Sequence, residues 1–229
     1  MVTQRILAAL AAMLSMASVG CANGESAVQI PAPQSQAAAP EGLETAVLAG
    51  GCFWGVEGVY EHVRGVRNVV SGYAGGDKDT AHYEAVSSGR TGHAEAVQIT
   101  FDPREISYGE ILRIFFSVVH DPTQLNRQGP DTGTQYRSNI FYTDATQQRI
   151  ATDYITQLNA TKLFPRPIVT RVDPLKGFYA AEAYHQDFIA HNPSYPYVVF
   201  NDLPKIRNLK QLFPDQFRDG PQVRGAARR

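Results

Sequence analysis

The sequence predicts an α+β domain, or a two-layer α/β domain, behind an export segment. Strand-like stretches are mixed with helix-like stretches without strict alternation, and Gly-Gly or Pro-containing turns separate them. The 229 residues leave room for one domain with tails. With 21 Lys and Arg against 22 Asp and Glu, the chain has no strong positive field, so nucleic acid is not an expected partner.

Residues 1–21 have the layout of a secretory signal, with an early arginine, an apolar run over residues 6–19 and small residues at the end. The run is too short to span a membrane. Cys21 follows a glycine, as in the bacterial lipoprotein cleavage box, but Ser18 stands where Leu is usual. Lipidation of Cys21 and plain cleavage near Ala22 both stay open. We expect an exported, periplasmic or outer-surface protein, lipid-anchored in the first case.

Residues 22–43 consist mainly of Ala, Pro, Gln and Ser, so we predict a disordered tether. The folded catalytic domain is expected over residues 44–217. Residues 218–229 are predicted to form a disordered basic tail.

The first elements of the domain are expected in quick succession. A strand over residues 45–49 ends at two glycines, and a helix follows over residues 52–63. Strands are predicted over residues 66–73 and 93–101. In the second of these, Glu95 is an acidic residue among apolar neighbours.

The later elements are mostly helical. Ser107 and Glu110 form a capping box for a helix over residues 107–120. A second long helix begins at Thr143 or Asp144 and ends near Leu163. The remaining elements are expected to be a strand over 168–172 and short helices over 180–190 and 204–212, with a turn at 193–196 between these helices.

Cys52 is the one cysteine of the expected folded region, because Cys21 belongs to the export segment. An internal disulfide is therefore excluded there, and a lone thiol in an oxidising compartment favours a reactive role. Unpaired amides at a helix start stabilise an anion, so the position predicts a lowered pKa and a nucleophilic thiolate. A small buried hydrophobic cysteine is the alternative.

Phe53 and Trp54 follow directly, and Trp54 is the single tryptophan. Two aromatic side chains beside a nucleophile can form an apolar slot for a methyl or thioether group. Ordinary core packing explains the pair equally well.

Six short motifs are spread along the expected folded region. They are Gly51-Cys52-Phe53-Trp54-Gly55, Ser71-Gly72-Tyr73-Ala74-Gly75-Gly76, His82-Tyr83-Glu84-Ala85-Val86, Gly92-His93-Ala94-Glu95-Ala96-Val97, His120-Asp121-Pro122-Thr123 and Gly133-Thr134-Gln135-Tyr136-Arg137-Ser138. From about Thr45 to Phe213 the chain resembles the methionine sulfoxide reductase A family. The resemblance implies a two-layer α/β sandwich with a mixed sheet and a ferredoxin-like core.

The resemblance also implies the chemistry. Cys52 attacks the sulfur of the (S)-epimer of methionine sulfoxide, free or in oxidised proteins, and becomes a sulfenic acid. Glu95 matches the acid that protonates the departing oxygen, with a pKa raised by burial. The residues that match the family's substrate contacts are Phe53 and Trp54 at the methyl group, Tyr83 and Tyr136 at the oxygen, and Asp131 near the substrate backbone or a site water.

The chain departs from many relatives of this family, because it has no cysteine after Cys52. An external thiol must then close the cycle, either a small thiol or a thioredoxin-like or glutaredoxin-like protein. We expect no bound cofactor, and the six histidines form no metal-binding pattern, so no metal is expected. We expect a monomer, with a possible membrane tether through Cys21.

Two competing functions remain. In a cysteine hydrolase, Cys52 would pair with His93, His120 or His185 and form an acyl intermediate without needing a reductant. A noncatalytic lipoprotein that recognises oxidised protein surfaces is the other.

Overall fold

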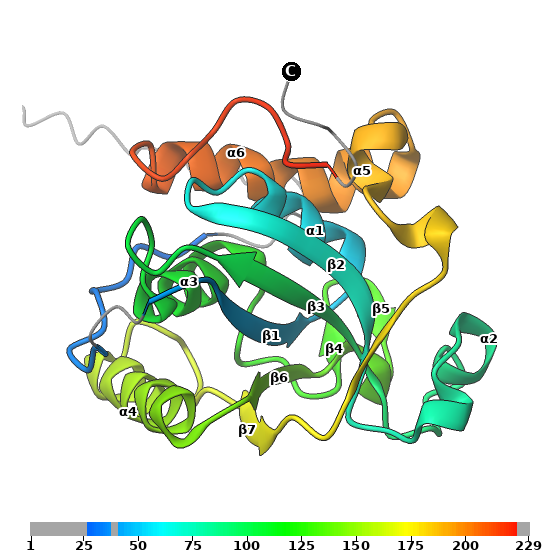
Figure 1. Ribbon diagram of the computed structural model, residues 1–229, viewed down its shortest axis with the longest axis horizontal. Helices are drawn as coiled ribbons and strands as arrows, with labels where there is room; N and C mark the ends of the chain where they lie inside the picture. Colours follow the sequence, from blue (N-terminus) through cyan, green and yellow to red (C-terminus); the bar gives the residue numbers. More distant parts are fainter. Residues whose placement is uncertain (1–26, 38–40, 224–229) are drawn as a thin grey trace, which may run out of the picture.

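The fold is built on one six-stranded sheet in the computed structural model, which describes residues 27–37 and 41–223 (Figure 1). The strand order is β7-β6-β1-β3-β2-β8, and β6 with β7 is the parallel pair among antiparallel ones. The strands are β1 (Glu44–Gly50), β2 (Val66–Ala74), β3 (Ala94–Phe101), β6 (Ser138–Tyr142), β7 (Arg171–Pro174) and β8 (Phe178–Ala180).

The centre of the sheet confirms the predicted α+β class with a ferredoxin-like core. Helix α1 (Phe53–Glu61) connects β1 to β2, and β3 lies between these two strands, antiparallel to both. Helix α3 (Tyr108–Ile114) then leads from β3 toward β6, which pairs with the free edge of β1. This is the split βαβ arrangement with a mixed sheet.

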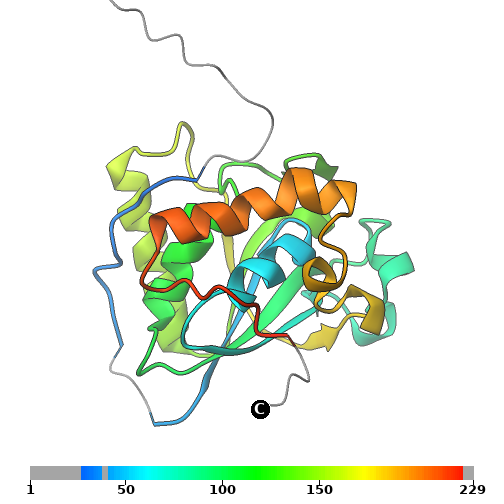
Figure 2. The ribbon, with the colours of Figure 1, turned by 90° about the horizontal axis from the view of Figure 1, so that it is seen from above.

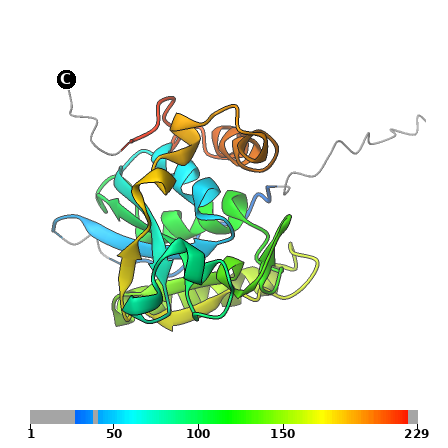
Figure 3. The ribbon, with the colours of Figure 1, turned by 90° about the vertical axis from the view of Figure 1, so that its right-hand side faces the viewer.

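Helices cover one face of the sheet. The main core cluster joins side chains of α1 and α3 with those of α4 (Ala145–Thr161) and α6 (Leu203–Leu212). Figures 2 and 3 show from two further directions that α6 packs outside α1. The opposite face carries a small cluster of mostly short side chains, with Phe141 as its one buried aromatic ring.

The alternation in β3 explains why Glu95 is buried. Val97, Ile99 and Phe101 point toward the helices and join the main core, and Glu95 belongs to the same row. Its carboxyl is therefore held on the helix-covered side, and the residue is 2% exposed. Strand periodicity thus places an acid inside the core.

The tether prediction is wrong for residues 27–37, which lie along α3 and α4. Ile30 is buried in the core, and its carbonyl accepts a hydrogen bond from Arg113 Nε at 3.2 Å. The Tyr154 hydroxyl donates to the Pro31 carbonyl at 2.7 Å. An extended segment can be fixed in this way through its carbonyls and one apolar anchor. The predicted signal and Cys21 lie outside the described residues.

The tail prediction is also wrong where the tail is described. The backbone N–H groups of Arg218 and Gln222 donate to the carbonyls of His62 and Glu61 at 2.9 and 2.8 Å. These bonds hold the chain across the C-terminal end of α1. Residues 224–229 lie outside the described part.

Several smaller elements differ from expectation. Strand β6 was not predicted from the sequence, and the strand expected over 168–172 is β7, slightly later. The helix expected over 180–190 divides into a 3₁₀ turn and α5 (Phe188–His191). The remaining short elements are a 3₁₀ turn at Lys78–Thr80, α2 (Tyr83–Val86), β4 (Arg127–Gln128), β5 (Asp131–Thr132), a 3₁₀ turn at Thr134–Tyr136, and π-helical turns at Phe115–Val119 and Val198–Asp202. Within residues 27–37 and 41–223, no helix has the length and apolar character that crossing a bilayer requires.

Candidate active site

Cys52 lies where β1 passes into α1, as predicted. Gly51 turns the chain with a φ of +94°, a conformation that side chains disfavour. A Cβ at this position would lie 2.7 Å from the Gln128 side chain, so both the backbone angle and the space require glycine. The half-buried Cys52 is the N-cap residue of α1. The turn therefore presents the thiol at the open end of the helix.

The first amides of α1 are shared between two acceptors. Phe53 N–H donates to the Glu95 carboxyl at 3.1 Å. The Trp54 N–H faces the Cys52 sulfur and lowers the pKa of the thiol. The helix start thus stabilises negative charge on both the sulfur and the carboxyl.

The predicted lowered pKa of Cys52 is wrong for the site without substrate. Burial raises the pKa of the thiol well above its ordinary value, and the nearby carboxylates of Glu95 and Asp202 raise it further. The single amide from Trp54 does not outweigh these effects. The resting thiol therefore holds its proton at neutral pH, and attack requires that this proton leave the sulfur.

Glu95 has the environment expected of an acid. Burial raises the pKa of its carboxyl to about 8, although the Phe53 amide acts in the opposite direction, and the charge of Asp131 raises it. The group is therefore mostly protonated at neutral pH. A neutral carboxyl beside the nucleophile can deliver a proton to a departing oxygen.

Tyr83 and Tyr136 reach this site from two different short elements. Tyr83 begins α2, where its backbone N–H donates to Glu182 Oε1 at 2.9 Å. Tyr136 ends the 3₁₀ turn that follows β5. Burial raises the pKa of both phenols, and the charges of Glu95 and Cys52 raise both further. Both hydroxyls are therefore neutral at neutral pH and can donate hydrogen bonds near Glu95 and Cys52.

Asp131 lies on the other side of Cys52. The two residues border a small cavity of about 30 Å³ together with Tyr197, Asn201 and Lys205. The Tyr197 hydroxyl donates a short hydrogen bond to the Asp131 carboxylate. Burial raises the pKa of Asp131, whereas this bond and the charge of Lys205 lower it. The sequence analysis missed Tyr197 and Lys205, which no motif singles out.

Phe53 and Trp54 both pack beside the nucleophile, but differently. Phe53 is buried, with its ring 5.0 Å from that of His185. Trp54 is half-buried and stacks on Phe188 at 3.7 Å between ring centroids. Its indole N–H donates to His185 Nδ1 at 3.2 Å. Trp54 is therefore the more accessible apolar surface, and Phe53 supports it from the core.

The histidines do not favour a hydrolase. Among the described residues none of the three candidates hydrogen-bonds Cys52. His93 and His120 are bound to other groups, Asp77 O and Ser138 Oγ, at 2.9 and 2.7 Å. His185 accepts from Trp54. A cysteine hydrolase needs a base in contact with its nucleophile, and this arrangement supplies an acid instead.

A second group of buried carboxyls lies further along α1. Oxygens of Glu57, Glu61 and Asp187 lie within 4.8 Å of one another, and all three residues are buried. Burial raises the pKa of Glu57 to about 7 and that of Glu61 to about 9. At neutral pH this cluster therefore holds protons. Because protonated carboxyls carry no charge, three acidic side chains can lie close together without strong repulsion.

The structure thus brings the predicted residues near one sulfur: a thiol, a neutral carboxyl, two phenols and an apolar ring. This combination defines a cysteine-dependent enzyme that removes an oxygen atom with the help of a proton donor. The family model of peptide methionine sulfoxide reductase matches residues 44–217. The chain belongs to this family, and it catalyses the thiol-dependent reduction of methionine sulfoxide to methionine, a repair of oxidative damage.

Individual relatives agree with this membership. The chain is 61% identical to peptide methionine sulfoxide reductase MsrA 2 of Mesorhizobium japonicum over 80% of this chain and 94% of the relative. It is 53% identical to MsrA 2 of Synechocystis sp. over 77% of this chain and 83% of the relative.

Solved structures agree as well. Methionine sulfoxide reductase A of Corynebacterium diphtheriae has a TM-score of 0.59 at 33% identity, covering 77% of this chain and 91% of that one. Reduced Mxr1 of Saccharomyces cerevisiae has a TM-score of 0.61 at 32% identity, covering 71% and 92%.

Proposed function

We propose that Cys52 is the nucleophile and Glu95 the proton donor in the reduction of the (S)-epimer of methionine sulfoxide, free or within proteins. The observation that carries this assignment is the pair formed at the start of α1. The Phe53 amide holds the Glu95 carboxyl at 3.1 Å, while the next amide faces the Cys52 sulfur. The acid and the nucleophile therefore approach the same substrate sulfoxide.

The proposed step transfers one oxygen atom. The Cys52 sulfur forms a bond to the sulfoxide sulfur, while the sulfoxide oxygen receives the proton of the Cys52 thiol and a proton from Glu95 and leaves as water. A water molecule then attacks the Cys52 sulfur, releases the methionine thioether and returns a proton to Glu95. The net change converts thiol and sulfoxide into sulfenic acid and thioether. Cys52 is oxidised, and the methionine sulfur is reduced. Tyr83 and Tyr136 donate hydrogen bonds to the oxygen as negative charge develops on it.

An external thiol completes the proposed cycle. It attacks the sulfenic acid at Cys52 and releases water, and a second thiol reduces the resulting mixed disulfide. Support comes from the composition, since Cys21 is the one other cysteine in the sequence. A thioredoxin-like protein, a glutaredoxin-like protein or a small thiol would serve, and the enzyme needs no bound cofactor.

We further propose that the protein acts after export, as a monomer, and that Cys21 is either lipidated or removed with the signal. The signal-like layout of residues 1–21 supports export, and the cysteine after a glycine supports the lipid anchor. Mass spectrometry of the mature N-terminus distinguishes an acylated Cys21 from a chain that begins at Ala22.

The catalytic assignment is tested by a single turnover without reductant. The protein is mixed with one equivalent of methionine (S)-sulfoxide, and a sulfenic-acid reagent is added. We expect one equivalent of methionine and one label on Cys52. The Cys52→Ser variant should give neither. Methionine release from Cys52→Ser, or an unlabelled Cys52 after turnover, would contradict the assignment.

A further inference from the structure

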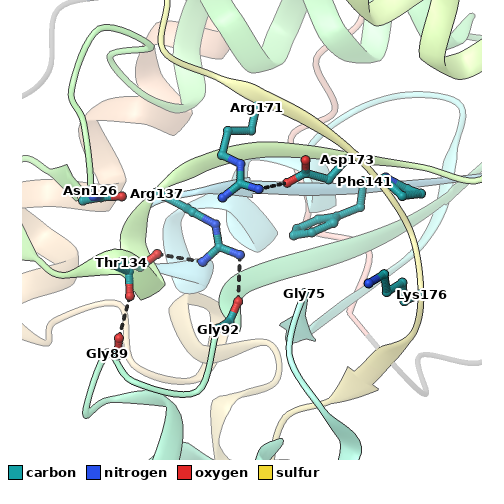
Figure 4. A pocket seen from close by; sticks show the side chains of 11 residues that line it. Gly75, Gly89, Gly92, Asn126, Thr134, Arg137, Phe141, Arg171, Asp173 and Lys176 are labelled. Atoms are coloured by element: carbon teal, nitrogen blue, oxygen red, sulfur yellow. Dashed lines mark hydrogen bonds and ion pairs between the residues drawn. The ribbon is translucent and has the colours of Figure 1, made fainter.

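A larger cavity lies on the sheet face opposite the helices, away from Cys52. Its volume is about 650 Å³, and Figure 4 shows the side chains around it. It opens between the parallel strands β6 and β7 and the glycine-containing loops at Gly75 and Gly92. None of Cys52, Glu95 or Asp131 lines it. It is therefore separate from the proposed catalytic site.

The walls of this cavity carry an excess of positive charge. Arg137, Arg171 and Lys176 line it together with one carboxylate, Asp173. The Arg171 guanidinium lies 2.9 Å from Asp173 Oδ2 and forms an ion pair with it. Three positive and one negative side chain leave two positive charges that the lining does not balance. Such a concave surface attracts anions.

Arg137 is the buried member of this set, at 7% exposure. Its guanidinium donates to three backbone carbonyls, those of His93 at 3.0 Å, Thr134 at 2.9 Å and Gly92 at 2.9 Å. Figure 4 shows the bonds to Thr134 and Gly92. No acceptor in the described part of the chain reaches its buried Nε. Burial lowers the pKa of Arg137, and the charge of Arg171 lowers it further. This repulsion between two guanidinium groups favours an added anion near them.

We propose that this cavity binds a small dianionic ligand, either a phosphate monoester or a dicarboxylate, through Arg137, Arg171 and Lys176. Two negative charges match the two unbalanced positive ones. Arginine presents a planar fork to an oxyanion, and lysine adds a mobile point charge. The cavity exceeds the size of one oxyanion group, so the organic part of the ligand lies beside Phe141 and Pro174.

The site also connects to the catalytic residues through Arg137. Its Nη1 donates both to the Thr134 carbonyl, in the turn that ends at Tyr136, and to the His93 carbonyl, just before β3, which carries Glu95. Its Nη2 donates to the Gly92 carbonyl. A Cβ on Gly75 would lie 2.8 Å from Arg137 Nη2, so this clamp leaves little space for movement. A bound dianion relieves the repulsion from Arg171 and stabilises the clamp. Arg137 is thus a positioning residue, and the bound ligand stabilises the hydrogen bonds that it makes.

Isothermal titration calorimetry of the full chain at constant ionic strength tests the binding directly. The probes are inorganic phosphate, succinate and the uncharged succinamide. We expect saturable one-to-one binding of phosphate or succinate, a higher melting temperature with the bound probe, and no binding of succinamide. Tighter binding of phosphate indicates a phosphate ester, and tighter binding of succinate a dicarboxylate. Absence of saturable binding by both dianions overturns the proposal.

Variants of residues that line the cavity locate the site. Arg171→Gln and Lys176→Gln should each weaken binding about tenfold, as expected for loss of a charge-assisted hydrogen bond. Asp173→Asn should strengthen it, because the competing carboxylate is removed while the shape is kept. Arg149→Gln on α4 removes an equally accessible arginine elsewhere and should change nothing. Unchanged affinity in Arg171→Gln and Lys176→Gln, or an equal loss in Arg149→Gln, overturns the assignment.

Discussion

The two ends of α1 each contact buried carboxyl groups, and their difference shows what separates the proposed catalytic acid from an acid that is only buried. Glu95 meets the first amide of the helix, and Glu61 lies in its last turn. Burial is the main cause of the raised pKa in both, to about 8 for Glu95 and about 9 for Glu61. A raised pKa alone would favour Glu61 equally as a functional group.

Their neighbours distinguish the two acids. The second influence on Glu61 is the charge of Glu57, and a hydrogen bond with Asp187 also raises its pKa. The proton of Glu61 is therefore held among other carboxyl groups. Glu95 instead acts on the pKa of Cys52, Tyr83 and Tyr136. Only this second arrangement places an available proton beside a nucleophile, so neighbouring groups decide the role.

The largest expected effect is on the rate of methionine release, which should depend on Glu95 and not on Glu61. In Glu95→Gln the amide keeps the shape but has no acidic proton, so the single-turnover rate of methionine release should fall about 10²- to 10⁴-fold. Circular dichroism should show an unchanged fold. A rate near that of the parent protein would remove Glu95 from the proton-donor role and leave burial as the reason for its pKa.

The next effect concerns Tyr83 and Tyr136, the phenols that are influenced by Glu95 and not by Glu61. Tyr83→Phe and Tyr136→Phe should each lower kcat/KM roughly 10²-fold, because each removes a donor to the developing oxyanion. Tyr179→Phe changes a half-buried tyrosine of β8 outside the site and is the matched control. If all three variants behave alike, the two hydroxyls pack against the acid without assisting it.

The positions of Cys52 and Glu95 could be predicted because both lie in regular patterns, whereas the acid role of Glu95 came from the family resemblance and stays a proposal. A glycine pair before a helix places the cysteine, and strand alternation puts Glu95 in the row of Val97 and Ile99. The sign of the Cys52 pKa shift was not predictable in this way. It depends on how deeply the sulfur is buried and on the approach of Asp202, which only tertiary packing determines.

Other parts of the fold depend on long-range pairing in the same way. Strand β6 is five residues long and pairs with β1 on one side and β7 on the other. Both edges of its backbone pair with distant strands, so no local sequence pattern predicts it. The segment over residues 27–37 has the composition of a tether, yet Arg113 and Tyr154 hold its carbonyls. Tyr197 reaches Asp131 across 66 residues of sequence. Composition and periodicity contain no signal for such contacts.

The smallest effect on activity belongs to the other end of α1, where the expected change is one of stability. The folded Glu61 carboxyl keeps its proton to about pH 9, whereas an unfolded glutamate loses it near the ordinary value of 4.5. Between these pH values the folded protein binds more protons than the unfolded chain, so Glu61 makes stability fall as the pH rises. Gln does not titrate. Relative to the parent protein, Glu61→Gln should therefore gain on the order of 4 kcal/mol in unfolding free energy between pH 5 and pH 8.5.

Urea unfolding at both pH values measures this change, with Glu41→Gln, an exposed residue, as the control. Comparing the two pH values within one variant removes any constant cost of placing an amide in the cluster. Methionine sulfoxide reduction by Glu61→Gln should match that of the parent protein at pH 7, since no contact joins Glu61 to Cys52 among the described residues. A pH slope equal to that of the parent would mean that Glu61 is ionised in the folded state. The cluster would then need a cation to balance its charge, because three adjacent buried carboxylates are not stable without one.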